Sequence, residues 1–293
     1  MGTFSEKTIR VTVTLGAGTF SGGGNTKIIE GLATDVSVTK PGLPEKNSAS
    51  VDIANIRLED MEQMTFLAFQ PLESNRNLIK IEAGERGRTL SIVFSGEITS
   101  AYADFSAAPS PRFRIEAISG GYASKMGTAP VSVNGSASAA ELIEQFAGQA
   151  GYNFRNEGVT ASVRNAVFNG SPIEKARAVA EEVGAELLID DGSMILLPYD
   201  KTRQGSAVLI TPETGLIGYP SFNSDGISFR CFYNPDLQQG GLVQIKSIVP
   251  KASGNWKITR LAHRLGVYGA SDAWQTDVDA VYLGGEKKWL TKS

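Results

Sequence analysis

The sequence predicts a β-rich protein of several domains, in which a small α+β unit lies between two strand-rich segments. Apolar and polar residues alternate with a period of two in many short runs before residue 129 and after residue 200, as in half-buried strands. Two helix-start patterns stand between those limits. The 293 residues include 32 glycines without a triplet period, so many turns separate the runs. A chain of this length is about twice the usual size of a single domain.

The first segment, residues 1–128, begins with the clearest strand. In residues 8–15 the apolar side chains Ile9, Val11, Val13 and Leu15 fall on one face, and the polar ones fall on the other. Turn residues separate further alternating runs, which contain Val36/Val38, Ala49/Val51/Ile53, Leu90/Ile92/Phe94 and Phe113/Ile115/Ala117. Several short strands at this spacing predict a barrel or a sandwich.

The second segment, residues 129–200, opens with a helix. Residues 138–141 form a capping box, in which the Ser138 hydroxyl and the Glu141 carboxylate each satisfy a free backbone N–H. We expect Gly148 or Gly151 to end this helix, and residues 159–168 to form a strand. The buried face of the helix is predicted to hold Ala139, Leu142, Ile143, Phe146 and Ala147.

A second capping box follows at residues 171–174, with Pro172 at the first helical position, where a missing N–H costs nothing. Gly184 ends this helix. In residues 186–197 two apolar runs flank Asp191-Gly192, a pair suited to the positive φ angles of a tight type I′ hairpin. The segment therefore reads as a small α+β domain. The stripe predicted to be buried on the second helix is Ile173, Ala176, Val179, Ala180 and Val183.

The third segment, residues 201–293, returns to strands. Prolines and the pair Gly240-Gly241 mark the turns between its strands. Its alternating runs contain Ile227/Phe229/Cys231/Tyr233, Val243/Ile245, Trp256/Ile258 and Val278/Ala280/Tyr282.

Composition excludes several classes of function. The net charge is −3, so the chain has no basic excess of the kind that binds nucleic acid or anionic lipid tightly. One cysteine and one histidine exclude a disulfide framework and a zinc site that needs three or four such ligands. No segment approaches 18 apolar residues, so we expect no membrane anchor and no targeting segment. We also expect no metal and no cofactor.

Three features could suggest a phosphate-binding loop, a catalytic histidine or a reactive cysteine, but a structural role explains each of them better. The glycine-rich run of residues 16–27 lacks the Gly-Lys-Ser/Thr helix start of a phosphate-binding loop, so we interpret it as a hairpin loop. His263, the only histidine, lies in a strand-like stretch without a nucleophile elbow, which favours a structural role. Cys231 falls on the buried face of its strand, where a thiol acts as a small apolar group.

The carboxylate pairs that are close together in the sequence do not indicate an acid/base catalytic site. Glu181/Glu182 fall on the polar side of a helix, Asp190-Asp191 serves a turn, and Asp277/Asp279 lie on the polar face of a strand. A solvated or interface-facing role is favoured for each. A pair distant in sequence stays open, because glycoside hydrolysis needs only that two carboxylates meet in space. The aromatic residues Phe229, Phe232 and Tyr233 lack interleaved lysines and are interpreted as core and interface residues. No catalytic residue is assigned.

The order of these units and several local strings resemble the baseplate hub proteins of phages with contractile tails. The resemblance covers most of the chain, and it rests on the order of motifs that are individually weak. They are residues 77–84, 92–98 and 103–105 in the first segment; the Ser138 helix, 151–154 and 168–172 in the second; and 214–220, 234–237, Gly240-Gly241 and 263–276 in the third.

The resemblance implies a fold of two tube-like antiparallel β-barrel domains with a small α+β domain between them. The domains would be 1–128, 129–200 and 201–293, and the second barrel can include segments from earlier in the chain. Three copies would form a ring that joins the six-fold tail tube to the three-fold central spike and lets DNA pass through its lumen without specific binding. The mild acidity would keep DNA from sticking to the wall.

The implied partners are two further copies of the chain, the tail tube or tube-initiator protein, the spike and other baseplate proteins. The implied location is the baseplate of the virion tail, after assembly in the host cytoplasm, and the hub would not be an enzyme. Hubs of related injection machines share this fold. The sequence does not identify the interface residues.

Two alternatives stay open. The first is a tail-associated cell-wall hydrolase. The second is a β-rich carbohydrate- or receptor-binding module, which would need an exposed aromatic platform that the isolated Trp256, Trp274 and Trp289 do not provide.

Overall fold

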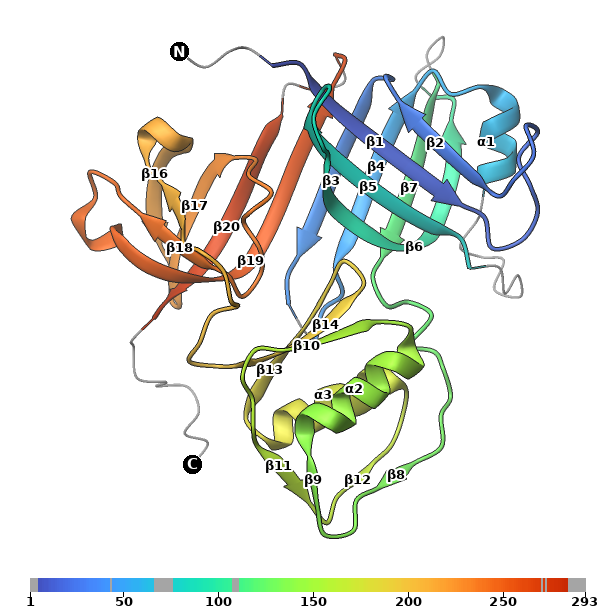
Figure 1. Ribbon diagram of the computed structural model, residues 1–293. Coiled ribbons are helices and arrows are strands. Elements are labelled where there is room, and N and C mark those ends of the chain that lie inside the picture. The colour runs from blue at the N-terminus through green and yellow to red at the C-terminus, as the bar shows by residue number, and fades with distance from the viewer. Residues whose placement is uncertain are drawn as a thin grey trace.

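The computed structural model describes residues 5–42, 44–65, 76–106, 111–269, 271 and 273–283. Two β units lie side by side, and an α+β unit lies below their junction in the view of Figure 1. The β-rich class is therefore confirmed. The domain boundaries at residues 128 and 200 stay predictions.

Within the described residues the first β unit has seven strands and one short helix. Its core is a cluster of buried apolar side chains that includes Ile9, Val51, Ile81 and Phe113. Leu265, from the far end of the chain, also packs into this cluster. The elements are β1 (Lys7–Thr14), β2 (Thr26–Glu30), β3 (Thr34–Lys40), β4 (Ser48–Ala54), α1 (Leu58–Met64), β5 (Leu78–Glu85), β6 (Ser91–Asp104) and β7 (Arg112–Ile118).

The predicted alternation holds in β1, β3, β4 and β7 and fails once, in β6. Ile92 is 47 % exposed, whereas its neighbour Val93 is buried. The register of β5 with β6 shifts at this point: Ile81 is opposite Phe94, but the next residue of β5, Glu82, is opposite Ile92, so Val93 is the extra residue of β6. A β-bulge places two residues opposite one and turns the side chains before it to the other face, so the prediction that Ile92 shares the face of Phe94 is wrong.

The α+β unit packs α2 and α3 on a small sheet, with a core of its own that includes Ile143, Phe146 and Val179. The sheet has the order β10-β14-β13, and β10 runs parallel to β14. The elements are β8 (Val131–Ser132), β9 (Ser136–Ser138), α2 (Ala139–Ala150), β10 (Asn153–Asn156), β11 (Ser162–Arg164), β12 (Val167–Phe168), α3 (Pro172–Glu182), β13 (Ala185–Asp190) and β14 (Ser193–Pro198).

The helix ends follow the capping chemistry of the sequence. The Ser171 hydroxyl accepts from the Glu174 N–H and the Glu174 carboxylate accepts from the Ser171 N–H, so the second capping box is complete. At α2 only half of the predicted capping box forms among the described hydrogen bonds, because the Ser138 hydroxyl accepts from the Glu141 N–H but the Glu141 carboxylate does not accept from the Ser138 N–H; Gly151 ends the helix at φ 78°. The single strand predicted over residues 159–168 is instead two short strands, because Asn165 takes a positive φ of 47° between them.

The second β unit has its own core, which includes Phe229, Cys231, Val243 and Val278. The predicted inward position of Tyr282 is wrong, because this ring is 60 % exposed at the end of its strand. The elements are β15 (Val208–Ile210), the short 3₁₀ helices η1 (Pro212–Thr214) and η2 (Pro250–Ala252), β16 (Leu216–Phe222), β17 (Gly226–Phe232), β18 (Leu242–Ile245), β19 (Gly254–Val267) and β20 (Trp274–Tyr282).

A single 13-stranded sheet runs through both β units. Its order is β16-β17-β20-β19-β3-β4-β7-β6-β5-β1-β2, with β18 and β15 attached at β19. Antiparallel pairing of β19 with β3 joins the units, from Leu261 opposite Lys40 to Val267 opposite Thr34. β15 and β18 pair in parallel, so the prediction of antiparallel strands fails there. In the part of the chain that the structure describes, the pairing path has two ends, at β16 and β2, and does not close into two barrels.

Candidate functional site

His263 and Cys231 lie in the interior of the second β unit. The His263 ring is buried on β19, and its Nδ1 lies 2.9 Å from the Thr276 hydroxyl on β20. Burial, followed by the nearby Lys40 charge, lowers the pKa of His263 to about 3, so the ring is neutral at pH 7. Burial raises the pKa of Cys231 to about 12, and Asp277 adds to this shift. A thiol that stays protonated is a poor nucleophile.

The glycine-rich run forms the loop between β1 and β2, as the sequence predicts. The two strands pair antiparallel, and Thr14 lies opposite Thr26 at the mouth of the loop. Three of its glycines, Gly18, Gly23 and Gly24, have positive φ angles that suit glycine. The loop opens into a strand and not into a helix, so it lacks the geometry of a phosphate-binding loop.

The three aromatic residues interpreted as core and interface residues differ in burial. Phe229 is buried, but Phe232 is 61 % exposed on the outer side of the same sheet. Tyr233 is half-buried, and its ring meets His263 and Trp274 edge to face at centroid distances of 5.4 and 5.6 Å. Trp256 is buried, and its Nε1 donates to the Ala252 carbonyl. Trp289 lies outside the described residues.

The pair Asp190-Asp191 does more than form a turn. Asp191 and Gly192 have φ angles of 43° and 85°, as the predicted hairpin requires. Lys40 Nζ lies 2.6 Å from Asp190 Oδ1 and 2.7 Å from Asp191 Oδ2, and Arg203 Nη1 donates to Asp190 Oδ2 at 3.1 Å. Of the two roles predicted for Asp190, a solvated or an interface-facing charge, the structure contradicts the first, because the side chain is buried against Lys40 and Arg203. We call Lys40, Asp190, Asp191 and Arg203 the junction network.

The two carboxylates of the junction network differ in charge environment. Burial works against the charged form of both, but Asp190 has two cations, Lys40 and Arg203, which hold its pKa below the ordinary value. Burial raises the pKa of Asp191 to about 6, because Lys40 compensates only in part and Asp190 repels the second charge. The same carboxylates raise the pKa of Lys40 despite its burial. The network is a buried structural contact, since its charges satisfy one another.

Further polar contacts fix the α+β unit to both β units. The Ser95 N–H of β6 donates to Asp191 Oδ1 at 3.2 Å, and the Asn47 amide donates to the Ile189 carbonyl at 2.9 Å. From the second β unit, Lys257 Nζ lies 2.5 Å from Glu186 Oε2. Such contacts connect residues far apart in the chain, which is why local sequence patterns give no signal for them.

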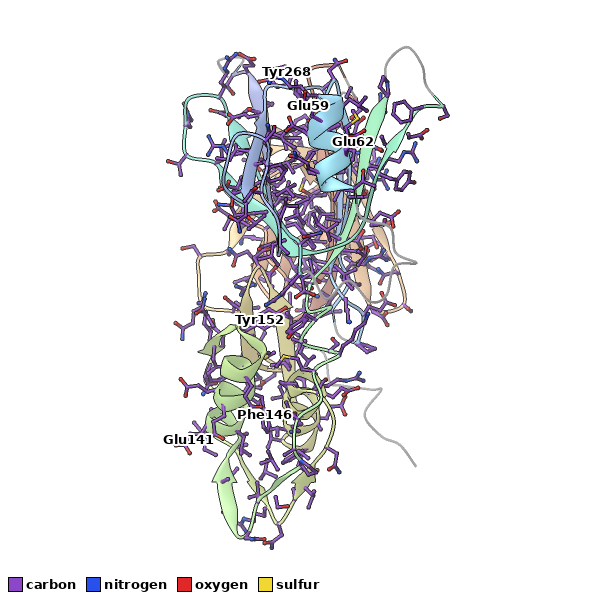
Figure 2. All side chains as sticks on the ribbon, turned by 90° about the vertical axis from the view of Figure 1, so that its right-hand side faces the viewer. Glu59, Glu62, Glu141, Phe146, Tyr152 and Tyr268 are labelled. Atoms are coloured by element: carbon purple, nitrogen blue, oxygen red, sulfur yellow. The ribbon has the colours of Figure 1, made fainter. Side chains whose placement is uncertain are left out.

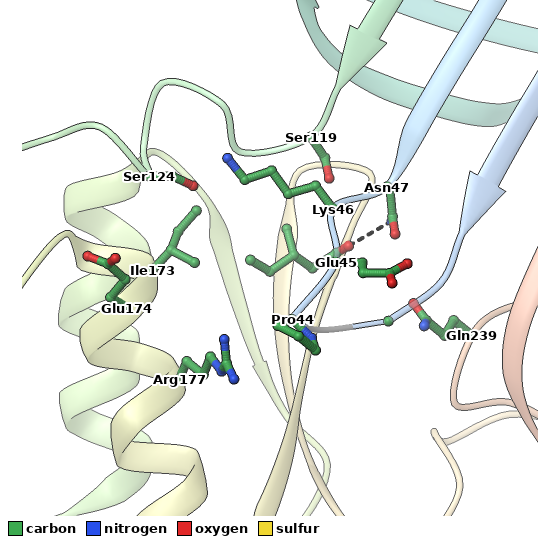
Figure 3. A pocket seen from close by; sticks show the side chains of 12 residues that line it. Pro44, Glu45, Lys46, Asn47, Ser119, Ser124, Ile173, Glu174, Arg177 and Gln239 are labelled. Atoms are coloured by element: carbon green, nitrogen blue, oxygen red, sulfur yellow. Dashed lines mark hydrogen bonds between the residues drawn. The ribbon is translucent and has the colours of Figure 1, made fainter.

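A cavity of about 300 Å³ lies beside this junction, between α3 and the loop that links β3 to β4. Figure 3 shows Glu174 and Arg177 on the helix side, with Lys46 on the opposite side. The lining holds two cations, Lys46 and Arg177, and two carboxylates, Glu45 and Glu174, so the cavity has no strong charge of one sign. Its remaining lining includes Gly42, Pro44, Asn47, Ser119, Ser124, Ile173, Ile189 and Gln239.

One polar face runs without interruption across seven strands of the large sheet. A single register row crosses β17, β20, β19, β3, β4, β7 and β6, and its residues are Phe232, Gln275, Arg264, Ser37, Ser50, Glu116 and Ser100. We call the sheet surface around this row the polar face. The row crosses from one β unit to the other only because β19 pairs with β3.

Most charges on the polar face are paired, but Arg260 on β19 and Glu116 on β7 are exposed and have no ion pair among the described residues. Arg230 Nε lies 2.6 Å from Asp277 Oδ1, and Arg264 approaches the other oxygen of the same carboxylate at 3.5 Å. Arg112 pairs with Asp35 at 3.2 Å. Arg114 lies 3.2 Å from Asp52 and 3.3 Å from Asp104. The Asp279 carboxylate accepts from the Ser228 hydroxyl at 2.6 Å. The face therefore presents hydroxyls and mostly neutralised charges, with Phe232 as an exposed apolar side chain at its β17 end.

Within the described ranges, no group of three or more histidine, cysteine or acidic side chains could hold a metal ion. The helices found there are also too short or too polar to span a membrane.

A family model and several solved structures are similar to this chain, and they agree with one another. The model of a family described as "Baseplate hub gp41" matches residues 8–271. A search of curated proteins finds no match. Among solved structures, the 43 kDa tail protein of prophage MuSo2 from Shewanella oneidensis aligns with a TM-score of 0.64 at 9 % identity, over 94 % of this chain and 97 % of that one.

Two further structures show the same fold at similar identity. A tail protein from Neisseria meningitidis MC58 aligns with a TM-score of 0.63 at 10 % identity, over 93 % of this chain and 96 % of the other. The Escherichia coli c3393 protein, described as a component of the type VI secretion system, aligns with a TM-score of 0.53 at 9 % identity, over 85 % and 73 %. At these identities the likeness is one of fold.

Proposed function

This chain belongs to the baseplate hub gp41 family, and we propose that it is a structural hub subunit, three copies of which form a ring in the baseplate of a phage tail. The ring joins the six-fold tail tube on one side to the three-fold central spike on the other. The observation that carries this proposal is the pairing of β19 with β3, which makes two β units into one continuous sheet. Three copies would then present six such units around the axis.

We further propose that the polar face lines the lumen through which DNA passes. Tight binding of a duplex requires free cations, whose contacts with phosphates release counterions. On the polar face Arg230, Arg264, Arg112 and Arg114 already pair with carboxylates, so phosphates gain little at these four residues, and Arg260 is the exposed arginine of this face without an ion pair among the described residues. The mild net negative charge of the chain by itself predicts weak DNA binding. On this face we attribute the weak binding instead to ion pairs that occupy four of the arginines. The proposed contact with DNA is transient and independent of sequence.

Two measurements test the ring and its lumen. Light scattering of the purified chain, alone and with its spike, should give the mass of a trimer, and an image of the tail tip should show the polar face inside. A monodisperse monomer in both preparations, or a polar face turned outward, would contradict the proposal.

The passage of DNA is tested by adding positive charge to the lumen. In Ser37→Lys/Ser48→Lys both changes fall on exposed polar-face residues, and we expect particles that assemble normally but eject DNA more slowly. The control Ser136→Lys/Ser162→Lys alters exposed strand serines of the α+β unit, with the same change of charge. Equal ejection rates for the two variants would count against the lumen assignment.

The hub is proposed to have no enzymatic activity. A zymogram on cell-wall substrate checks this directly, since a cleared zone from the purified chain would favour the alternative of a tail-associated hydrolase.

A further inference from the structure

The two ends of the large sheet carry exposed apolar side chains on edges that pair with no further strand in the part of the chain that the structure describes. β16 ends the pairing path on one side and β2 ends it on the other. Tyr219 and Phe222 on β16 are 69 % and 56 % exposed, and Ile28 on β2 is 60 % exposed. An exposed apolar edge favours association with another chain unless something covers it. Figure 1 shows α1, next to β2, and the loop after β18 at opposite sides of the molecule.

The first of these ends is basic. The loop of residues 246–253 follows β18, and its short helix η2 lies next to β16. Ile248 in this loop is 73 % exposed, the highest value among the exposed large apolar residues described. Lys246 and Lys251 flank it and are exposed, and the loop contains no carboxylate. Neither lysine forms an ion pair with any residue that the structure describes. We call Lys246, Ile248, Lys251, Tyr219 and Phe222 the basic end.

The opposite end is acidic. α1 lies against β2, since Lys27 of β2 pairs with Asp60 of α1 at 2.8 Å. Leu58 on the same helix is 58 % exposed. Figure 2 looks at the molecule from this side and shows Glu59 and Glu62 on α1. Both are exposed and have no ion pair within the described ranges; Arg57, just before the helix, is the exposed cation beside them. We call Ile28, Leu58, Glu59 and Glu62 the acidic end.

We propose that the basic end of one copy binds the acidic end of the next copy, and that this contact repeats around the ring. This inference rests on the proposed function. Each end pairs an apolar centre with charges, and the charges have opposite sign, which gives electrostatic complementarity. A contact between two different patches on identical chains closes into a ring when the rotation fits. Pro220 lacks an N–H and the β16 ladder is interrupted by a bulge, so side chains carry the contact and not a continued ladder.

Charge reversal tests this contact on the full-length chain. In Lys246→Glu/Lys251→Glu, and in Glu59→Lys/Glu62→Lys, like charges meet across the contact. We expect the concentration at which half of the chains are trimeric to rise at least about tenfold in each, measured by light scattering over a dilution series. The quadruple variant restores opposite charges and should regain the trimer. The controls are Lys46→Glu/Lys201→Glu and Glu144→Lys/Glu182→Lys, which alter exposed residues away from both ends.

The outcomes separate this inference from the function on which it rests. A wild-type chain that stays monomeric with and without its spike overturns the ring and, with it, this contact. A wild-type trimer that all reversal variants retain overturns the contact and leaves the ring intact. Loss of the trimer in both double variants without recovery in the quadruple variant also overturns the contact. If a charge variant fails to fold by circular dichroism, Ile248→Ser and Leu58→Ser test the apolar centre, and unchanged trimers in both refute it.

Discussion

Lys40 Nζ, on β3, lies 2.6 Å from Asp190 Oδ1 at the end of β13, and the two side chains are only 6 % and 7 % exposed. The residues are 150 positions apart in the chain. This ion pair joins the large sheet to the α+β unit, and Arg203 joins it from the segment that leads into the second β unit. All three parts of the molecule therefore meet at the Asp190 carboxylate.

Replacement of Lys40 by methionine should destabilise the fold by about 3 kcal/mol, because it leaves two carboxylates buried with one remaining cation. Chemical denaturation of the variant and the wild type measures the difference. Lys80→Met is the matched control, since Lys80 pairs with Glu82 while 44 % exposed, and such a pair contributes less than about 1 kcal/mol. Equal losses in the two variants would show that the junction network contributes no more than a surface pair.

Asp191→Asn should change the pH dependence of stability. Because the pKa of Asp191 is raised from 3.8 to about 6, the folded state holds its proton more tightly than the unfolded state. The stability from this group is present below pH 3.8 and is lost as the pH rises through 6. Wild type should therefore lose up to about 3 kcal/mol relative to Asp191→Asn between pH 3.8 and pH 6.

Denaturation curves of both proteins at several pH values give this difference. Asparagine suits the test because it accepts the positive φ of this turn and forms the same type of hairpin with Gly192. A constant difference across the range would contradict the raised pKa.

His263 should remain neutral through the physiological range. Its pKa is lowered from 6.5 to about 3, so as the pH falls below 6.5 the unfolded state takes up the proton first. The stability from this residue is present above pH 6.5 and is lost as the pH falls toward 3. The imidazole resonances in an NMR titration should not move between pH 8 and pH 5. A transition centred near 6.5 would show an accessible, unperturbed ring.

Cys231 should be inert toward thiol reagents in the folded protein. The side chain is fully buried on β17, and its pKa is raised to about 12, so thiolate is scarce at pH 8. A colorimetric thiol assay should show reaction only as denaturant unfolds the chain, with a rate that follows the unfolding transition. Rapid labelling of the native protein would indicate that the core of the second β unit opens readily.

Much of the local structure could be predicted from particular residues. Ser171 and Glu174 fix the start of α3, and the Asp191-Gly192 pair fixes the β13–β14 hairpin, because each depends only on hydrogen bonds or φ angles of neighbouring residues. Ile92 escaped prediction because a bulge depends on the partner strand. The ion pair of Asp190 with Lys40 was not predicted for the same kind of reason, because the two residues lie 150 positions apart in the chain.

The sequence by itself determined which residues of most strands face a core, where α2 and α3 begin and end, and that reactive side chains are few. These properties follow from periods of two or 3.6 residues and from capping chemistry, which act over a few positions. Only the tertiary structure decided that β3 pairs with β19, that one polar face crosses both β units, and that the junction network is buried. Strand pairing and ion pairs between distant segments depend on how whole faces fit in space, and no local period carries that information.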